Sequence, residues 1–178
     1  MSRSSSQPSS DPPTRRLFFA LWPDETLCSE IIARRALLGE LGPRRIPDHN
    51  LHLTLVFLGN QPLTLLDDIE EIAGEQAPLK GDLELDHFGA FPRAHVAWLG
   101  GAAPLSLNEW VNALSERLAQ AGVRFLHREF KPHVTLFRRV EAPSSWPECS
   151  PLRWPLANFS LIESIPSQPY QVLRTWSL

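Results

Sequence analysis

A four-residue pattern, histidine-apolar-threonine-apolar, occurs twice in this chain and constrains its fold more than any other feature. The copies are residues 52–55 (HLTL) and, 81 positions later, residues 133–136 (HVTL), and each lies in an apolar run that predicts a strand. Alternate side chains of a strand share a face, so each copy presents one imidazole and one hydroxyl together and buries its two apolar residues on the other face. The fold must therefore supply two strands that each keep one polar face.

The sequence around the motifs predicts alternating strands and helices. Prolines and glycines mark many of the boundaries, because proline cannot continue a helix and glycine commonly ends one. The order strand, helix, motif strand occurs once in each half, which predicts two lobes related by a pseudo-twofold axis, and the expected class is α+β with mostly antiparallel sheets. We expect helices near residues 24–38, 63–76 and 105–121, and strands near residues 16–22, 51–58, 83–88, 95–99, 133–136, 157–163 and 170–176.

The first residues and the two cysteines indicate the domain organisation and the cellular compartment. Residues 1–13 are rich in serine and proline and hold no apolar stretch, which is typical of a disordered tail and unlike a secretory signal. We expect residues 14–178 to form one domain, and no apolar run approaches the length of a transmembrane helix. Cys28 and Cys149 lie far apart without metal or redox spacing, which favours two reduced thiols in a cytoplasmic protein.

The charge of the chain limits the class of ligand. A formal net charge of −3 argues against a protein that coats long nucleic acid through a broad basic surface. A small phosphate ligand remains compatible with it, because basic residues gather near both motifs. They are Arg44 and Arg45 before the first motif and Arg124, His127, Arg128, Lys131, Arg138 and Arg139 around the second. Local positive potential is one interpretation, and solvated charges beside buried strands are the other.

Two imidazoles near their ordinary pKa supply an acid and a base in one turnover. At a phosphodiester, one imidazolium would protonate the leaving oxygen while one neutral imidazole took a proton from water, so this chemistry needs neither a metal nor a cofactor. Thr54 and Thr135 would donate hydrogen bonds to the phosphoryl oxygens. We therefore interpret His52 and His133 as a shared catalytic pair.

Other interpretations of the histidines remain open. An ordinary strand with a polar face also produces one copy of the pattern, so only the repeat points to catalysis. A zinc site is the competing chemistry, but no Asp, Glu or Cys lies at ligand spacing around either motif. We expect the six tryptophans mostly in the core or in the packing between the lobes. We expect the remaining histidines on the surface or in packing: His49, His87, His95 and His127.

Beyond the motifs, the chain resembles the two-histidine phosphoesterase superfamily and, within it, the bacterial RNA 2′,3′-cyclic phosphodiesterases also called LigT or ThpR. The resemblance covers nearly everything after the tail, and the two motifs with their flanks are its most specific part. It rests on residues 16–21, 50–59, 88–93, 131–138, 160–164 and 170–178.

The resemblance implies a bilobal fold in which two antiparallel sheets face each other across a central cleft, with helices on the outside. It implies metal-independent hydrolysis of terminal 2′,3′-cyclic phosphates of RNA or nucleotides to 2′-phosphomonoesters. By position, His52 would be the general acid that protonates the 3′ oxygen and His133 the general base that activates water, while Thr54 and Thr135 would hold the phosphoryl oxygens.

The resemblance also implies substrate contacts from Phe57 and Arg138, each five residues past its histidine. Strict strand alternation puts both on the face opposite the histidines, so they reach the cleft only where a twist, a bulge or the strand end redirects them. Their assignment therefore depends on a local irregularity in both motif strands.

The resemblance leaves the activity with alternatives. Some family members join RNA ends through a 2′-5′ linkage, and we expect this reverse chemistry as a secondary activity at most, because a 5′ hydroxyl must outcompete bulk water. An esterase for another small cyclic phosphate, such as an ADP-ribose derivative, is one rival, and a non-catalytic RNA-end-binding module is the other. A monomer is expected, because one chain carries both motifs.

Overall fold

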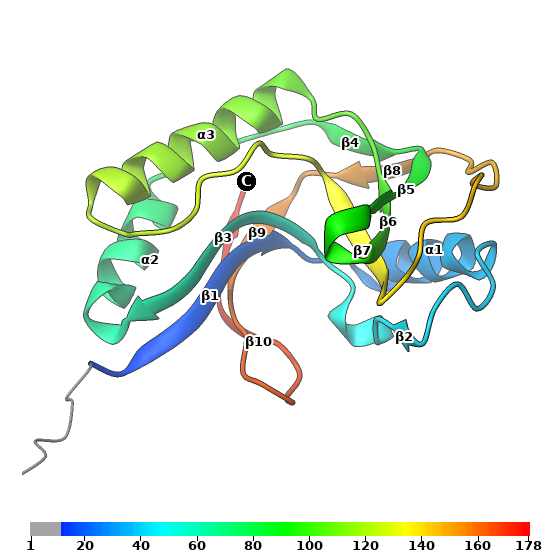
Figure 1. Ribbon diagram of the computed structural model, residues 1–178. Helices are drawn as coiled ribbons and strands as arrows, with labels where there is room; N and C mark the ends of the chain where they lie inside the picture. Colours follow the sequence, from blue (N-terminus) through cyan, green and yellow to red (C-terminus); the bar gives the residue numbers. More distant parts are fainter. Residues whose placement is uncertain (1–11) are drawn as a thin grey trace, which may run out of the picture.

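The computed structural model describes residues 12–178 (Figure 1). Its three α-helices are joined by short 3₁₀ turns and strands, and their mixture with antiparallel strands confirms the α+β class. The helices are α1 (Glu25–Ala36), α2 (Leu66–Gly74) and α3 (Leu105–Gln120). The strands are β1 (Thr14–Leu21), β2 (Arg44–Arg45), β3 (Leu53–Pro62), β4 (Asp82–Leu85), β5 (His87–Phe91), β6 (Val96–Gly100), β7 (His133–Arg138), β8 (Leu152–Pro155), β9 (Asn158–Glu163) and β10 (Gln171–Ser177).

The main sheet consists of two halves that meet at the motif strands. Its order is β10-β9-β1-β3-β7-β6-β5, with β2 paired to β7, and β4 and β8 form a separate two-stranded sheet. β3 and β7 pair at one position, Leu53 with Val134, whereas the pairs inside each half run over several residues. The two expected sheets are therefore continuous through this pair and diverge on either side of it, β10-β9-β1-β3 carrying the first motif and β2-β7-β6-β5 the second.

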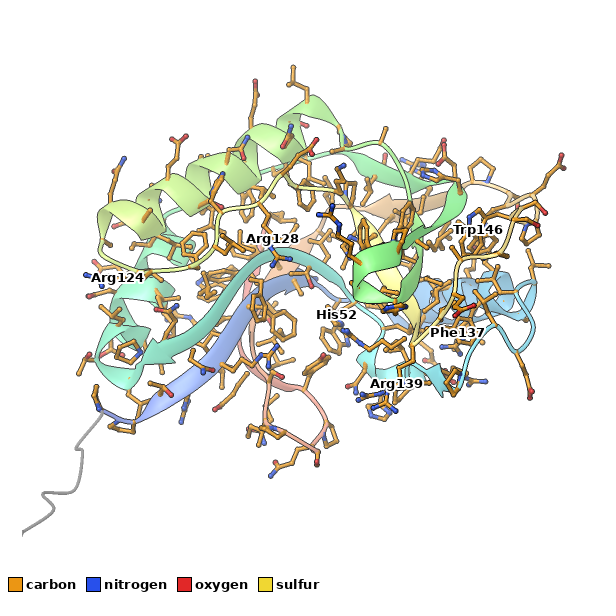
Figure 2. All side chains as sticks on the ribbon, viewed as in Figure 1. His52, Arg124, Arg128, Phe137, Arg139 and Trp146 are labelled. Carbon is orange, nitrogen blue, oxygen red and sulfur yellow. The ribbon has the colours of Figure 1, made fainter. Side chains whose placement is uncertain are left out.

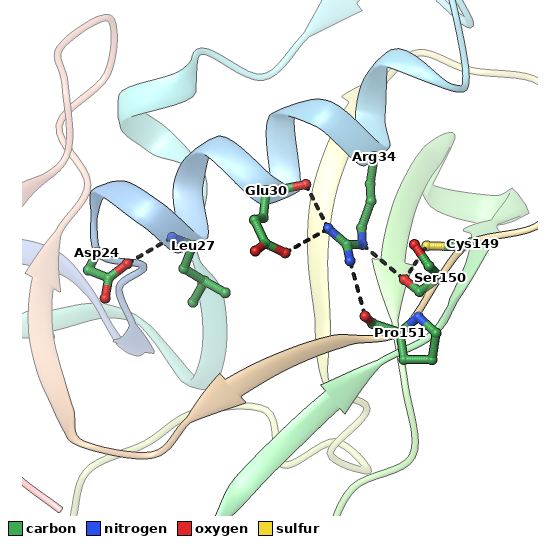
Figure 3. Close-up of polar contacts among 7 residues, drawn as sticks. All are labelled: Asp24, Leu27, Glu30, Arg34, Cys149, Ser150 and Pro151. Atoms are coloured by element: carbon green, nitrogen blue, oxygen red, sulfur yellow. Dashed lines mark hydrogen bonds and ion pairs between the residues drawn. The ribbon is translucent and has the colours of Figure 1, made fainter.

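The helices cover the outer faces of the two halves. α2 and α3 pack together and against β10 and β3, and α1 lies beside β8 (Figure 1). The Asp24 carboxylate begins α1 by accepting a hydrogen bond from the Leu27 amide at 2.8 Å, the usual N-terminal cap. Near the end of α1, the Arg34 guanidinium donates to the carbonyl oxygens of Ser150 and Pro151, at 3.0 Å each, which ties the chain before β8 to this helix (Figure 3).

The expectations from the sequence missed two strands, β2 and β8, and a break within one expected strand. β2 falls between the helix expected to end near residue 38 and the strand expected to begin near residue 51, where no strand was expected. β8 lies in a proline-rich stretch without an expected strand. Leu152 and Trp154 of β8 are buried while Arg153 is exposed, so the alternation was present but short, and the prolines at its ends suit an edge strand. The single strand expected at residues 83–88 is divided at Asp86 into β4 and β5, which belong to different sheets.

The structure bears on the expectations for the N-terminal residues, for the two cysteines and for membrane-spanning helices. Of the expected tail, residues 1–11 lie outside the described residues, and Pro12 and Pro13 lead into β1 without forming a helix or strand. Cys28 and Cys149 are free thiols. Within residues 12–178, no helix combines the length and the apolar character that crossing a membrane requires.

Candidate active site

One cavity of about 550 Å³ receives side chains from both motif strands. It opens where β3 and β7 diverge, and the loop between α3 and β7 forms part of its wall, from Phe125 to Lys131. The structure brings together in this cavity all the site residues that we expected from the sequence: His52, Thr54, Phe57, His133, Thr135 and Arg138.

A β-bulge in β3 directs Phe57 into the cavity. In the pairing of β3 with β1, Val56 lies opposite Phe19 and Thr54 opposite Ala20, so Leu55 is an extra residue. Leu55 and Val56 are both buried, and after this doubled apolar position Phe57 returns to the face of Thr54. The exposed Phe57 ring then lines the cavity.

The second motif strand has its bulge at the equivalent position. In the pairing of β7 with β6, Phe137 lies opposite Ala97 and Thr135 opposite Trp98, so Leu136 is extra. Leu136 and Phe137 are both buried, and Arg138 faces the cavity. Both extra residues lie three positions after a histidine, so the irregularity that the sequence required for Phe57 and Arg138 is present in both strands.

The two imidazoles are oriented by the same contact. Nδ1 of His52 lies 2.7 Å from the carbonyl oxygen of Asn50, and Nδ1 of His133 lies 2.7 Å from that of Lys131. A carbonyl oxygen only accepts hydrogen bonds, so each Nδ1 carries a hydrogen. In the neutral ring Nε2 is then the basic nitrogen, and in the protonated ring it is the nitrogen whose proton is free to transfer.

The ring of His52 is enclosed by aromatic side chains. Trp22 stacks on it with ring centres 5.6 Å apart, Phe18 lies at 5.0 Å, and Tyr170 meets it edge-on at 5.2 Å. Burial, the largest cause, acts together with positive charge on His133 and Arg138 to lower the pKa of His52 to about 4, against the opposing effect of the Asn50 hydrogen bond. His52 is therefore neutral at pH 7 in the unliganded protein.

The ring of His133 has a more open aromatic neighbourhood. Phe91 meets it edge-on at 4.9 Å, and the Trp98 ring centre lies 6.3 Å away. Burial lowers the pKa of His133, opposed by the Lys131 hydrogen bond, and the nearby Arg138 charge lowers it as well. Both imidazoles thus lose protons more readily than an exposed histidine.

A buried arginine fixes the turn that holds His52. Arg35 of α1 is only 3% exposed, and its guanidinium donates to the Ile46 carbonyl at 2.9 Å and to the Asp48 carboxylate. Asp48 begins the 3₁₀ turn that ends at Asn50, the partner of His52. The Arg35 hydrogen bond holds the pKa of the Asp48 carboxyl below its usual range, so this anchor remains ionised down to acidic pH.

A buried amide fixes the loop on the other side of the cavity. Gln61 of β3 is 2% exposed and donates to the carbonyl oxygens of Leu58, at 2.6 Å, and Arg124, at 2.8 Å. This contact holds the start of the loop beside β3, and Arg128 farther along lies over the strand (Figure 2). The loop ends at Lys131, the partner of His133.

The basic residues noted in the sequence divide into two groups. His127, Arg128, Lys131 and Arg138 line the cavity, together with Arg16, whose guanidinium lies 5.1 Å from the centre of the Phe57 ring. The other group does not line it: Arg44, Arg45, Arg124 and Arg139. Arg124 lies near the α2 end of the molecule, far from His52 (Figure 2). Local positive charge at the cavity is therefore confirmed for part of the set.

Sequence reasoning missed the aromatic side chains around the histidines. We expected the tryptophans mostly in the core or between the lobes and gave none of them a place at the site, whereas Trp22 and Trp98 are half-buried beside His52 and His133. One signal was available: the first strand is apolar on both faces, which indicates a second buried surface. Phe18, Ala20 and Ile162 form that surface with Trp22 and Tyr170, separately from the main core.

A metal site in a protein needs several ligand side chains close together. Among residues 12–178, no three side chains of His, Cys, Asp or Glu come together as a metal site would require. The chemistry that the described residues support is proton transfer by two imidazoles, with hydroxyl and guanidinium groups beside them.

Comparison with known proteins gives a consistent result. The family described as the 2′-5′ RNA ligase superfamily matches residues 23–164. The RNA 2′,3′-cyclic phosphodiesterase of Thermus thermophilus is 34% identical, with 92% of this chain and 90% of that protein covered. That of Escherichia coli is 32% identical, with 92% and 97% covered. The crystal structure of Escherichia coli LigT complexed with 3′-AMP superposes with a TM-score of 0.82 at 29% identity, covering 93% of this chain and 99% of LigT.

Proposed function

This chain belongs to the 2′-5′ RNA ligase superfamily, a group of two-histidine phosphoesterases, and we propose that it is an RNA 2′,3′-cyclic phosphodiesterase that works without a metal. The observation that carries the proposal is the pair of imidazoles in one cavity, each with Nδ1 bonded to a carbonyl and Nε2 left for chemistry. Curated relatives that carry this activity in their names match the chain over nine-tenths of its length.

The reaction is an in-line displacement at the cyclic phosphorus. Nε2 of His133 takes a proton from water as the water oxygen bonds to phosphorus, and Nε2 of His52 gives its proton to the 3′ oxygen as the phosphorus–O3′ bond breaks. The product is a 2′-phosphomonoester, and the two histidines have exchanged protonation states. A proton exchange with solvent restores them.

The threonine hydroxyls act where negative charge increases. Thr54 and Thr135 line the cavity on the same strands as the histidines, two residues farther along. Each donates a hydrogen bond to a non-bridging phosphoryl oxygen, a contact that strengthens as the pentacoordinate transition state gains charge. A neutral hydroxyl does this without lowering the pKa of the adjacent imidazole, as an added cation would.

The substrate supplies the protonation state that catalysis needs. In the unliganded protein the pKa of each histidine is lowered, mainly by burial, so neither is extensively protonated at pH 7. A phosphate anion between the rings favours an imidazolium and raises both pKa values. Binding of the anionic ester and loading of the acid are therefore coupled, while a neutral ester of the same shape gains no such proton.

The walls of the cavity suit the end of an RNA. Phe57 offers an exposed ring for a base, and Arg16 lies against that ring at 5.1 Å from its centre. Arg128 and Arg138 add positive charge for phosphate groups. One chain supplies both motifs, so the proposed enzyme is complete as a monomer, and two free thiols suit a cytoplasmic location.

The test is hydrolysis of a short RNA that ends in a 2′,3′-cyclic phosphate, in EDTA, by wild type, His52→Ala and His133→Ala. We expect a 2′-phosphate from wild type and near-total loss in both variants. His95→Ala removes an exposed histidine outside the cavity and is the matched control. Activity that disappears in EDTA, or that survives the loss of either cavity histidine, contradicts the proposal.

The same assay separates the rival substrates. A cyclic phosphate on an ADP-ribose derivative is offered beside the RNA end, and the larger kcat/KM identifies the preferred class. Measurable turnover of either substrate excludes a module that only binds RNA ends.

A further inference from the structure

Three segments meet at the end of β7, at the edge of the cavity. Residues 42–47 lie along one side of β7, and residues 91–97 lie along the other. Together with residues 135–140, these segments contain five arginines, one histidine and no Asp or Glu. The basic residues are all exposed: Arg44, Arg45, Arg93, His95, Arg138 and Arg139. Only Arg138 lines the cavity, so most of this positive charge lies outside the site described above.

The centre of this group is a pair of arginines on neighbouring strands. Arg44 of β2 lies directly opposite Arg138 of β7, so the two side chains leave the sheet on the same face. Like charges in this position repel each other and destabilise the pair of strands. Among the ion pairs of residues 12–178, none involves Arg44, Arg138 or Arg139, whereas Arg45 is paired with Asp48 at 3.0 Å. An anion bound between the two guanidinium groups would relieve their repulsion.

Arg138 connects this pair with the two imidazoles. It lines the cavity together with His133 and Thr135. The pKa of each histidine is lowered by burial and also by the Arg138 charge, so this guanidinium lies close to both rings. β7 advances roughly 10 Å from Thr135 to Arg138, and β2 lies about 5 Å to the side of β7. The long Arg44 side chain can therefore reach a phosphate that lies one ribose away from the phosphate between the histidines.

Arg139 adds a third guanidinium to the pair. Its φ of 59° lies in the left-handed region, so the regular alternation of β7 ends at this residue. Arg139 lies on the β2 side of the molecule, whereas Arg124 lies at the opposite end near α2 (Figure 2). Guanidinium groups bind phosphate through paired hydrogen bonds, and three of them without a carboxylate partner favour an anion at this edge of the cavity.

We propose that Arg44, Arg138 and Arg139 bind the phosphate on the 5′ oxygen of the terminal nucleotide, which joins this nucleotide to the rest of an RNA chain. The proposal rests on the hydrolase function proposed above and adds a substrate class to it. A free nucleoside 2′,3′-cyclic phosphate lacks this second phosphate, so the enzyme selects the ends of RNA chains over free cyclic nucleotides. The site holds the chain and takes no part in the proton transfers.

The experiment compares three substrates that share one terminal base. They are a nucleoside 2′,3′-cyclic phosphate, the same compound with a 5′-phosphate, and a dinucleotide that ends in the cyclic phosphate. In wild type, the dinucleotide should exceed the first compound in kcat/KM roughly tenfold, which corresponds to about 1.4 kcal/mol. A tenfold rise in salt concentration should lower this advantage roughly fivefold, as expected for one neutralised phosphate on a single strand.

Variants of the arginines outside the cavity locate the site. Arg44→Gln should remove most of the dinucleotide advantage, Arg139→Gln should remove part of it, and Arg44→Lys should retain part because it keeps the charge. Arg45→Gln removes a neighbouring charge that is paired with Asp48, and Arg124→Gln removes an exposed charge far from His52; both should keep the advantage. Each variant is compared with itself on the first compound, so a loss of folded protein cancels in the ratio.

The outcomes distinguish this proposal from the hydrolase function on which it rests. Equal kcat/KM for all three substrates in wild type overturns the phosphate site, as does an advantage that survives Arg44→Gln and Arg139→Gln combined. An equal loss in Arg45→Gln or Arg124→Gln indicates general electrostatic attraction and overturns it too. A gain confined to the 5′-phosphate compound contradicts binding of an RNA chain. Wild type without activity on any of the three refutes the hydrolase function itself.

Discussion

The two motif halves of the molecule share a backbone frame and differ in what surrounds it. Each places an imidazole and a hydroxyl two residues apart, a bulge at the next position, and a carbonyl two residues before the histidine as the Nδ1 partner. His52, however, is enclosed by three aromatic rings, and a buried arginine fixes the turn before it, whereas His133 also lines a second cavity of about 320 Å³. The frame fixes what each histidine contacts, and the surroundings make the environments of the two imidazoles unequal.

Removing one histidine at a time should have the largest effect and tests whether the two halves act together. We expect His52→Ala and His133→Ala each to lower kcat/KM by roughly 10²–10⁴, because each removes one proton transfer. The kcat/KM of the double variant should be only slightly lower than that of the less active single variant, because the effects of two groups that act in one step are not additive. Steady-state kinetics on a cyclic-phosphate RNA measures all three, and a multiplicative loss in the double variant would show that the halves act independently.

The threonines test whether the halves are equivalent at the phosphoryl oxygens. Thr54→Val and Thr135→Val keep the shape of the side chain and remove its donor, so each should lower kcat by about 10²–10³. KM should change less, because the lost bond strengthens in the transition state. Thr64→Val, at an exposed threonine outside the cavity, is the control. A large loss at only one of the two strands would assign the oxyanion contact to that half.

The unequal burial of the histidines predicts a pH dependence of stability. His52 has a folded pKa of about 4 against an ordinary value of 6.5, so the unfolded chain binds more protons between these values. Its contribution to stability is complete above pH 6.5 and is lost as pH falls toward 4, by roughly 3 kcal/mol at 1.36 kcal/mol per pH unit. Urea unfolding of wild type and His52→Phe across this range measures it.

His52→Phe should flatten the stability curve more than His133→Phe does, because the His52 ring is the more deeply enclosed. The opposite order would reverse the assignment of the two environments. Below about pH 4 the free energy of unfolding should fall in wild type and in both variants alike. Asp48, whose pKa is also lowered, then takes up a proton, which weakens its bond to Arg35.

The smallest expected effect is that of removing the buried Arg35, which fixes the turn before His52. Arg35→Met removes charged hydrogen bonds to Ile46 and Asp48 and should lower the free energy of unfolding by roughly 1.5–3 kcal/mol. Arg45→Met breaks the exposed contact to the same Asp48 and should cost at most about 1 kcal/mol. Denaturant unfolding compares them, and equal costs would mean that burial does not strengthen the anchor.

The sequence was enough to predict most of the backbone frame of the two motif strands but little of what surrounds the two histidines. The repeat at residues 52–55 and 133–136 predicted two strands and a shared site, and the α+β class followed from helix and strand periodicity. The family resemblance needed more, because it rested on the motifs with their flanks and on four further segments. The bulges were implied by adjacent apolar residues, Leu55-Val56 and Leu136-Phe137, but strict alternation alone would have turned Phe57 and Arg138 away. The catalytic roles of these side chains stay predictions.

The enclosure of His52 was harder to predict, because it depends on contacts across the chain. Trp22 follows β1, and Tyr170 comes from the loop before β10, almost 150 residues later in the sequence. No local pattern specifies that they meet at one imidazole. The same holds for β8, whose partner β4 lies about 70 residues earlier, so a short strand between prolines gave no local indication of its pairing.

The single residue pair between β3 and β7 has a mechanical consequence. Leu53 and Val134 each lie one residue from a histidine, so this rung acts as a pivot close to both imidazoles. A rotation of the half-sheets about this pair would displace their outer ends most and the two rings least. The distance between the two imidazoles is therefore the dimension of the cavity that such a rotation would change least.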